Sequence, residues 1–290
     1  MAELKTYRGN CHCGAFVYEV DVPEIKSVGQ CSCSICSKKA YLWIYPHRQS
    51  FRVLKGDEDA LTSYTVTGQF LHKFCSNCGT ALLCSAPGFP PERQLALNVR
   101  AIQGIVPWDL ERRPVDGASY GAQYEAPKYT GPGPTAEIEN AKMYYGSCHC
   151  GAVRVALRSL PLDKDYPEQV VECNCSICSI NGCIWIYPRV DQLDYQGREN
   201  LATYRFGNRH LQKTFCKTCG VSFANEAAEL TQEEFDALPS DRTRDWHQRF
   251  KANCGFNIRV LNDYDFTSIK EPWRNTRGQD MEPRYVYPSL

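Results

Sequence analysis

Cysteine is the residue type in this chain whose number and spacing point most directly to chemistry. Thiolates paired within a tight turn, as Cys-X-Cys or Cys-X-X-Cys, are ligands that zinc takes in tetrahedral sites. The first half of the chain predicts zinc binding because it carries seven cysteines in this arrangement: Cys11 and Cys13 in GNCHCG, Cys31, Cys33 and Cys36 in CSCSICS, and Cys75 and Cys78 in FCSNCG.

The same seven cysteines return in the same order in the second half. Self-similarity of this kind indicates a duplicated domain. Three further cysteines, Cys84, Cys183 and Cys254, have no counterpart in the other copy, and we expect them to be buried small apolar residues. The repeated set is Cys148 and Cys150 in GSCHCG, Cys173, Cys175 and Cys178 in CNCSICS, and Cys216 and Cys219 in FCKTCG.

Seven thiolates are too many for one mononuclear zinc site. Each copy can hold one closed site with three spare cysteines, or two sites that share the ligands as four plus three. A zinc with three protein ligands keeps a position open for substrate or water, as catalytic zinc does. In that division the three-ligand sets are Cys31, Cys33 and Cys36, and Cys173, Cys175 and Cys178, because one loop can wrap one ion. The closed sites are then Cys11, Cys13, Cys75 and Cys78, and Cys148, Cys150, Cys216 and Cys219.

The residues alone leave two other interpretations open. Each triplet can complete a purely structural site, or its cysteines can remain reduced thiols without metal. His12 and His149 lie between two ligands each, and a residue in that position more often points away from the metal, so we leave both outside the ligand set.

Composition limits the class of protein. The 290 residues leave room for two domains, each with its own core, and 43% hydrophobic with 23% charged residues is typical of soluble globular chains. The 33 basic and 33 acidic residues cancel, so no net field draws the chain to nucleic acid or to an anionic membrane. No signal peptide or membrane span is evident, which predicts a cytoplasmic address, where clustered cysteines are more often metal ligands than disulfides.

Short runs rich in Val, Ile, Tyr and Phe, bounded by Gly, Pro, Asp or Asn, predict that both copies are mainly β. One charged segment, 230–251, is found in the second copy alone. There Thr231 and Glu234 form a capping-box pattern that predicts a short helix to about Leu238, in a solvated flap rather than a lid. The predicted strands lie within 15–20, 41–45, 63–66, 153–157, 183–187 and 202–206.

The domain division that follows is 1–111, 112–142 and 143–290. The middle part, rich in Pro and Gly, is expected to be a connector. We expect some of it to pack on the first domain, because Tyr120, Tyr124 and Tyr129 are unusually aromatic for a bare linker.

The order Gly-X-Cys-His-Cys-Gly, Cys-X-Cys-X-X-Cys, Phe-Cys-X-X-Cys-Gly closely resembles the glutathione-dependent formaldehyde-activating family, which also contains the centromere protein V type proteins. The resemblance covers 6–99 and 144–258. It implies two tandem β-tent zinc-binding domains, two zinc ions per domain, and glutathione as substrate or co-substrate. In that family the triplet holds the zinc at the glutathione site, so the six triplet cysteines named above are the implied catalytic residues.

The leading hypothesis is therefore a zinc-dependent carbon–sulfur lyase or synthase acting on a glutathione-type thiol adduct, such as S-hydroxymethylglutathione or another conjugate. An open zinc lowers the pKa of a bound thiol, and the thiolate can then add to an aldehyde. The alternative is a non-catalytic, zinc-stabilised protein-interaction module, which needs only the closed sites. A redox sensor is disfavoured because it needs exposed thiols without metal. The expected partner is a small-molecule thiol, and a homo-oligomer is compatible with the sequence.

Residues near the triplets are candidates for a substrate pocket. Trp43 with Tyr45, and Trp185 with Tyr187, can wall such a pocket or face the core of a strand. Arg100 and Arg259, preceded by Asn98 and Asn257, can hold a carboxylate or form surface ion pairs. The triplets are followed by SKKAY and SINGC respectively, so the two pockets are expected to differ and one copy can be degenerate.

Overall fold

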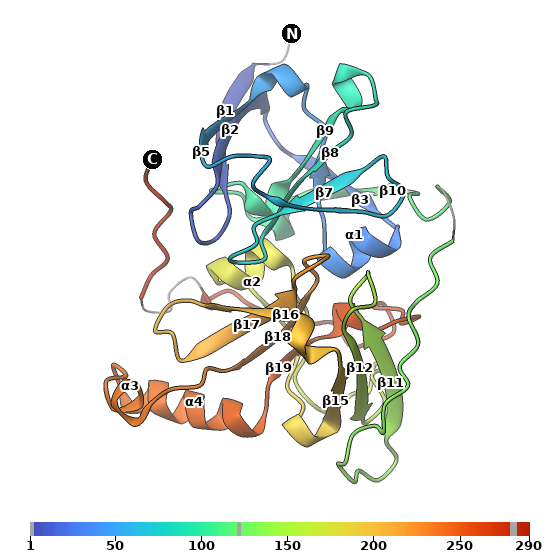
Figure 1. The fold of residues 1–290 in the computed structure, drawn as a ribbon, viewed down its shortest axis with the longest axis vertical. Helices are drawn as coiled ribbons and strands as arrows, with labels where there is room; N and C mark the ends of the chain where they lie inside the picture. Colours follow the sequence, from blue (N-terminus) through green and yellow to red (C-terminus); the bar gives the residue numbers. More distant parts are fainter. Residues whose placement is uncertain (1–2, 121–122, 279–282) are drawn as a thin grey trace.

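The computed structural model describes residues 3–120, 123–278 and 283–290. Within these residues, each half of the chain forms one three-stranded and one seven-stranded sheet. Figure 1 shows the first half above the second, with the short helices α1 and α2 meeting where the halves adjoin. The predicted fold, two tandem mainly β copies with a helical insertion in the second, is confirmed.

The first copy stacks its two sheets around a shared apolar core. Short 3-10 turns connect the strands at Arg48–Ser50, Pro91–Arg93, Val99–Ala101 and Pro107–Asp109. Helix α1 (Ser34–Lys39) follows directly on the third strand. The three-stranded sheet contains β1 (Leu4–Asn10), β2 (Val17–Pro23) and β5 (Phe51–Lys55), and the other has the order β10 (Glu111–Val115), β3 (Ser27–Cys31), β4 (Trp43–Ile44), β9 (Leu95–Asn98), β8 (Ala81–Ser85), β7 (Leu71–Phe74), β6 (Thr62–Thr65).

The second copy repeats this arrangement, with equivalent strands next to the same neighbours; its large sheet is given below starting from the opposite edge. Its 3-10 turns are Val190–Gln192, Arg198–Asn200 and Ile258–Val260, and α2 (Ser176–Asn181) corresponds to α1. The small sheet contains β11 (Lys142–Ser147), β12 (Arg154–Ser159) and β15 (Leu193–Gln196), and the large sheet has the order β16 (Leu201–Arg205), β17 (Leu211–Cys216), β18 (Ser222–Ala227), β19 (Gly255–Asn257), β14 (Trp185–Ile186), β13 (Val171–Cys173), β20 (Trp273–Asn275).

The six predicted strand segments all contain strands, although two of them shrink to two residues. The runs at 41–45 and 183–187 keep only β4 and β14. Cys84, Cys183 and Cys254 are buried, as expected.

The inserted segment contains two helices where one was predicted. Helix α3 (Gln232–Asp236) begins with the capping box of Thr231 and Glu234 but ends before Leu238. Helix α4 (Asp241–Ala252) follows and packs against β18, burying Phe250 and His247. The His247 ring Nε2 lies 2.9 Å from the carbonyl oxygen of Ala228. This half of the insertion is therefore a packed amphipathic helix, and the expectation of a solvated flap is wrong for it.

The connector and the C-terminal tail play equivalent structural roles. Each contributes a strand that runs parallel to the strand ending in the first cysteine of a triplet, β10 beside β3 and β20 beside β13. We call residues 111–120 and 123–128 the first strap, and residues 273–278 and 283–288 the second strap. The division at 112 and 142 stays a prediction, but the start of the connector belongs to the first large sheet.

The tyrosines of the connector do not all pack where they were expected. Tyr120 donates a hydrogen bond to Gln69 of the first copy, but Tyr124 and Tyr129 contact the second copy. Tyr124 stacks on His149, with ring centroids 4.3 Å apart. The first strap therefore crosses from one copy to the other.

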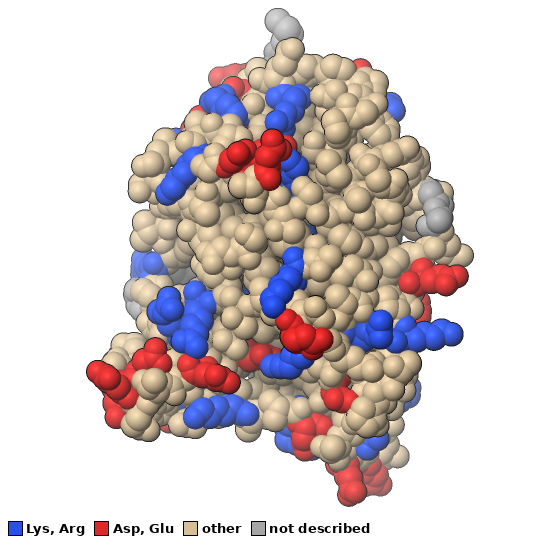
Figure 2. Space-filling model, viewed as in Figure 1, with Lys and Arg blue, Asp and Glu red and all other residues tan. Residues whose placement is uncertain are grey.

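No helix among the described residues is long and apolar enough to cross a membrane. Figure 2 shows acidic and basic side chains interspersed on the face in view, without a broad patch of either sign.

The two copies pack closely enough that small residues are required between them. Gly79 and Gly220 follow Cys78 and Cys219, the last of the seven repeated cysteines in each copy, and both have positive φ, at 72° and 70°. A Cβ at Gly79 would lie 2.7 Å from the Phe215 ring, and one at Gly220 would lie 2.8 Å from the Phe74 ring. Each of these glycines thus admits an aromatic ring of the other copy.

Gly220→Ala tests this packing, with Gly104→Ala as its control. Both positions have positive φ, so each alanine costs about 1 kcal/mol in backbone strain. A Cβ at position 104 would have no other atom within 4 Å, whereas the methyl group at position 220 would contact the Phe74 ring. We expect Gly220→Ala to lower the free energy of unfolding by roughly 1–3 kcal/mol more than the control does, measured by urea denaturation. Equal losses would show that the copies do not pack at this point.

Candidate metal centres and active site

Four cysteines from two turns meet in each copy and form a tetrad. Cys11 and Cys13 lie in the turn between β1 and β2, and Cys75 and Cys78 lie in the turn between β7 and β8. The sulfur atoms of the group lie within 4.8 Å of one another, with Cys11 to Cys13 at 3.5 Å and Cys13 to Cys75 at 3.6 Å. Zn–S bonds of about 2.3 Å in a tetrahedron place sulfurs about 3.8 Å apart, so the group fits a zinc ion.

The second tetrad repeats this geometry. Cys148 and Cys150 have sulfurs 3.4 Å apart, and Cys150 and Cys216 have sulfurs 3.6 Å apart, with Cys219 completing the group. All of these cysteines are free rather than paired in disulfides. A closed set of four thiolates, mostly buried, is the donor set of a structural zinc site.

The three remaining cysteines of each copy form a triad around the start of α1 or α2. Cys31 ends β3, Cys33 caps α1, and Cys36 lies in its first turn. Cys173, Cys175 and Cys178 take the same positions at β13 and α2. Each triad has its sulfurs within 4.8 Å of one another. The structure therefore brings the cysteines together in the groups of four and three that the sequence predicts. Metal binding and reactivity stay predictions.

Each triad also accepts a hydrogen bond from the tryptophan of the next strand. Trp43 Nε1 donates to Cys36 Sγ at 3.3 Å, and Trp185 Nε1 donates to Cys178 Sγ at 3.3 Å. Both indoles are buried, whereas Tyr45 and Tyr187 are exposed. The tryptophans are therefore buried in the core, and each also donates a hydrogen bond to a sulfur of its triad.

The histidine inside each tetrad binds the triad region of the other copy. His149 Nε2 lies 2.8 Å from Ser34 Oγ, and its Nδ1 lies 2.7 Å from the Tyr64 hydroxyl. Ser34 is the first residue of α1, between Cys33 and Cys36. His149 thus points away from its own cysteines, as expected, and places the second tetrad beside the first triad.

The reciprocal contact exists on the other side. His12 Nε2 lies 2.9 Å from Ser176 Oγ, and its Nδ1 lies 2.9 Å from the Tyr204 hydroxyl. Burial lowers the pKa of both histidines to about 4, so both are neutral at physiological pH. Two equivalent contacts therefore relate the copies by a pseudo-two-fold axis, and each triad adjoins the tetrad of the other copy.

The straps extend this exchange between copies. Gly117 lies against Cys31, where a Cβ would approach the sulfur to 2.3 Å, and Gly278 lies against Cys173, where a Cβ would approach it to 2.6 Å. Further along the second strap, Tyr285 stacks on His12 with ring centroids 4.5 Å apart, just as Tyr124 stacks on His149. Each strap therefore covers the triad of its own copy and then reaches the tetrad of the other.

Arg100 and Arg259 bind backbone carbonyls rather than acidic partners. Arg100 Nε donates to the carbonyl oxygen of Ala40 at 2.8 Å, and its Nη1 donates to that of Ser179 at 3.2 Å. Arg259 makes the equivalent bonds to Gly182 and Ser37. Each guanidinium thus joins the C-terminal ends of α1 and α2. The expectation of surface ion pairs is wrong for both.

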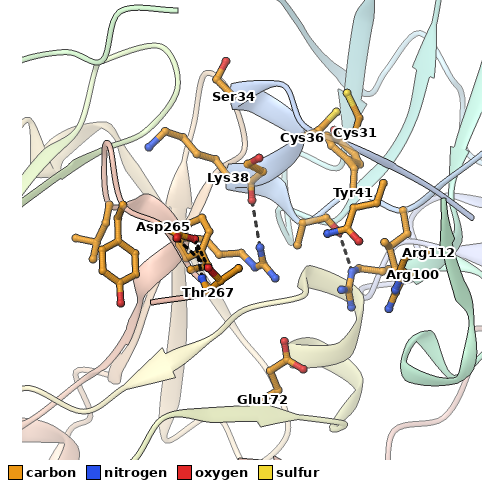
Figure 3. Close-up of a pocket in the computed structure, with 18 of the residues that line it drawn as sticks. Cys31, Ser34, Cys36, Lys38, Tyr41, Arg100, Arg112, Glu172, Asp265 and Thr267 are labelled. Carbon is orange, nitrogen blue, oxygen red and sulfur yellow. Dashed lines mark hydrogen bonds between the residues drawn. The ribbon is translucent and has the colours of Figure 1, made fainter. Parts of the chain in front are cut away.

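A large cavity opens between the two copies beside the first triad. Its volume is about 910 Å³, and Cys31, Cys36 and Tyr41 form part of its wall. Figure 3 shows these residues with Arg100, Arg112 and Glu172 around the same space. The lining carries five basic and three acidic side chains, in contrast to the neutral chain as a whole. The second copy contributes Arg259 and Arg274 to this wall, and the first strap contributes Arg112.

Arg112 and Arg274 escaped the sequence analysis because they lie on the straps, far along the chain from any cysteine. Arg112 Nη2 donates to the carbonyl oxygen of Pro107, whereas its Nη1 is buried and has no hydrogen-bond partner among the described residues. Arg274 lies over the Trp108 ring, 5.6 Å from its centroid, and Trp108 donates to Glu172 at 3.0 Å. The fold alone brings these groups to the triad.

The comparison with known protein families agrees with this architecture. The model of a family described as glutathione-dependent formaldehyde-activating enzyme matches residues 6–107 and 143–253. These two segments make up most of the chain, one in each copy. The chain therefore belongs to the glutathione-dependent formaldehyde-activating family, with two tandem copies of its domain.

Among solved structures, a crystal structure of a Rhodobacter sphaeroides protein is similar to part of the chain. The sequence identity is 25%, over 45% of this chain and 99% of that one, and the TM-score is 0.33.

Metal analysis tests the cysteine groups directly. We expect one zinc for each tetrad and each triad, and Cys75→Ser should lose the zinc of the first tetrad. Because a structural zinc contributes to folding, this variant should also lose on the order of 3 kcal/mol or more of unfolding free energy. Cys84→Ser, a buried cysteine outside the groups, should keep the full zinc content. An unchanged zinc content in Cys75→Ser would contradict the assignment of the tetrad.

Proposed function

We propose that the protein is a zinc-dependent carbon–sulfur lyase or synthase that acts on adducts of a glutathione-type thiol. The observation that carries this proposal is the position of the first triad. Its Cys31 and Cys36 line a cavity large enough for a tripeptide thiol, while separate tetrads in both copies can hold the structural ions. Membership of the glutathione-dependent formaldehyde-activating family supports the same reaction class.

The donor set of the triads suits the chemistry that this reaction needs. When bound by three thiolates, zinc supplies a Lewis acid with a remaining position for a substrate thiolate. The surrounding residues hold the triad in shape for this. Trp43 donates to Cys36 Sγ and so stabilises negative charge on that sulfur, and Gly117 leaves room for Cys31 Sγ under the first strap.

The basic side of the cavity suits the other end of such a substrate. A glutathione-type thiol carries carboxylates far from its sulfur, and planar guanidinium groups bind carboxylates with two parallel hydrogen bonds. Arg112 keeps an Nη1 that has no hydrogen-bond partner in the part of the chain that the structure describes, and Arg274 lies nearby over Trp108. We assign both to binding the carboxylates. Arg100 and Arg259, the candidates from sequence, already use their Nε and Nη1 atoms on backbone carbonyls.

An interaction module would need the tetrads and nothing more. The triads favour the enzyme over that alternative because Cys31 and Cys36 of the first triad line a cavity that also carries five basic side chains.

The double variant Cys31→Ser/Cys173→Ser tests the proposal, since it removes a ligand from each triad and leaves both tetrads intact. Exchange between formaldehyde plus glutathione and their adduct is measured by NMR exchange spectroscopy, against the spontaneous rate. We expect the wild-type protein to accelerate this exchange and the double variant to lose the acceleration while unfolding at a similar urea concentration. A folded double variant that is as active as the wild type would overturn the proposed function.

A further inference from the structure

Helix α1, which carries part of the first triad, is bound to the second copy at its beginning and near its end. The Oγ of its first residue, Ser34, lies 2.8 Å from His149 Nε2. Near the other end of the helix, the carbonyl oxygen of Ser37 accepts a hydrogen bond from Arg259 at 3.4 Å. Helix α2 makes the equivalent pair of contacts to the first copy, so these contacts follow the pseudo-two-fold symmetry.

Two lysines of α1 add contacts to the second copy that break this symmetry. Lys38 Nζ donates to the carbonyl oxygens of Ser147 and Val260, at 3.1 Å and 2.9 Å. Lys39 Nζ donates to the carbonyl oxygen of Cys219 at 3.0 Å. Both lysines are buried, and a buried ammonium group is stable only when it has such partners. The end of α1 is therefore fixed to the second copy by hydrogen bonds that it needs.

The partners of the two lysines belong to both turns of the second tetrad. Ser147 directly precedes Cys148, and Cys219 is itself a member of the tetrad. His149, which contacts the start of α1, lies between Cys148 and Cys150. The turns that form the second tetrad therefore also hold the helix of the first triad.

The reciprocal link, from the first tetrad to the second triad, lacks these contacts. At the positions of Lys38 and Lys39, α2 has Ile180 and Asn181. Asn181 Nδ2 donates to the carbonyl oxygen of Ile177 in its own helix, at 2.8 Å. Helix α2 contains no charged residue, so none of its side chains can place a charge beside the first tetrad.

Metal binding in the second tetrad changes the energy of the lysine contacts. A zinc ion bound by four thiolates keeps a net negative charge, because the charges of the four sulfurs outweigh that of the ion. Two ammonium groups beside such a centre are attracted to it, and a buried site screens this attraction only weakly. Without the ion, the bonds that join the two turns through the metal are also lost. The position of α1 is therefore coupled to the metal of the second tetrad.

We propose that the second tetrad, when it holds its metal, positions the first triad, and that Lys38 and Lys39 are the positioning residues that connect the two centres. The second copy is thus a structural requirement for the first centre, whereas the second triad does not depend on the first tetrad in this way. The inference rests on the proposed function for the reactivity of the first triad, but not for the coupling between the two centres.

Lys39→Met tests the coupling, because methionine keeps much of the apolar stem but has no ammonium group. Cadmium NMR on the fully loaded protein gives each metal site its own resonance, and Cys31→Ser and Cys173→Ser identify the resonances of the two triads. When a chelator is added stepwise, we expect the first triad of Lys39→Met to lose its metal at about 10-fold lower chelator concentration than in the wild type. The second triad should be unchanged, which separates positioning from a general loss of stability.

Asn181→Leu, at the equivalent position of α2, is the matched control and should leave the first triad as it is in the wild type. Lys38→Met removes the contact with the other turn of the second tetrad and carries the same expectation as Lys39→Met. If urea denaturation shows that one lysine variant does not fold, the other decides. An unchanged first triad in a folded lysine variant, or an equal loss of metal at both triads, would overturn the inference. The proposed function would survive that result, because it depends on the activity of Cys31→Ser/Cys173→Ser.

Discussion

The histidine inside each tetrad makes the contact on which the rest of the structure depends. His12 and His149 reach out of their own copies and bind Ser176 and Ser34 at the start of the helix in the other copy's triad. Because both rings are neutral and both nitrogens of each have a hydroxyl partner, the contact sets where a tetrad of one copy lies relative to a triad of the other. Two domains that could have been joined loosely are thereby held as a pseudo-symmetric pair, and the cavity between them exists only in that arrangement.

Within this symmetric frame the buried charges are not symmetric. The first copy has Lys39 in α1, whose Nζ donates to the carbonyl oxygen of Cys219 in the second tetrad, where α2 has Asn181. The second copy instead has Lys213 in β17, where the first has His72. The first triad and the second tetrad therefore have two buried lysines beside them, Lys38 and Lys39 of α1, whereas the second triad has Lys213 of β17. Duplication preserved the cysteines while the groups around them diverged.

The features predicted from sequence are those with a local pattern. The cysteine groups follow from ligand spacing, the strands from short apolar runs, and the start of α3 from the capping box of Thr231 and Glu234. Helix α4 was missed because half of its residues are charged and only Trp246 and Phe250 are strongly apolar. Contacts between the copies could not be predicted, since no local pattern specifies which copy a side chain will face. Arg112 and Arg274 belong to this group, because the fold brings both to the cavity between the copies. One signal was available: Gly117, Tyr124 and Pro127 recur with the same spacing as Gly278, Tyr285 and Pro288, which marks the straps as part of the repeat.

X-ray absorption at the zinc K edge, with and without glutathione, tests the central claim that a triad keeps a place for the sulfur of a substrate. The account predicts a mixed shell of sulfur and lighter atoms in the zinc-loaded protein. On addition of glutathione, the contribution of oxygen or nitrogen should fall and that of sulfur should rise. A shell that contains only sulfur before glutathione is added, or one that glutathione leaves unchanged, would contradict the account.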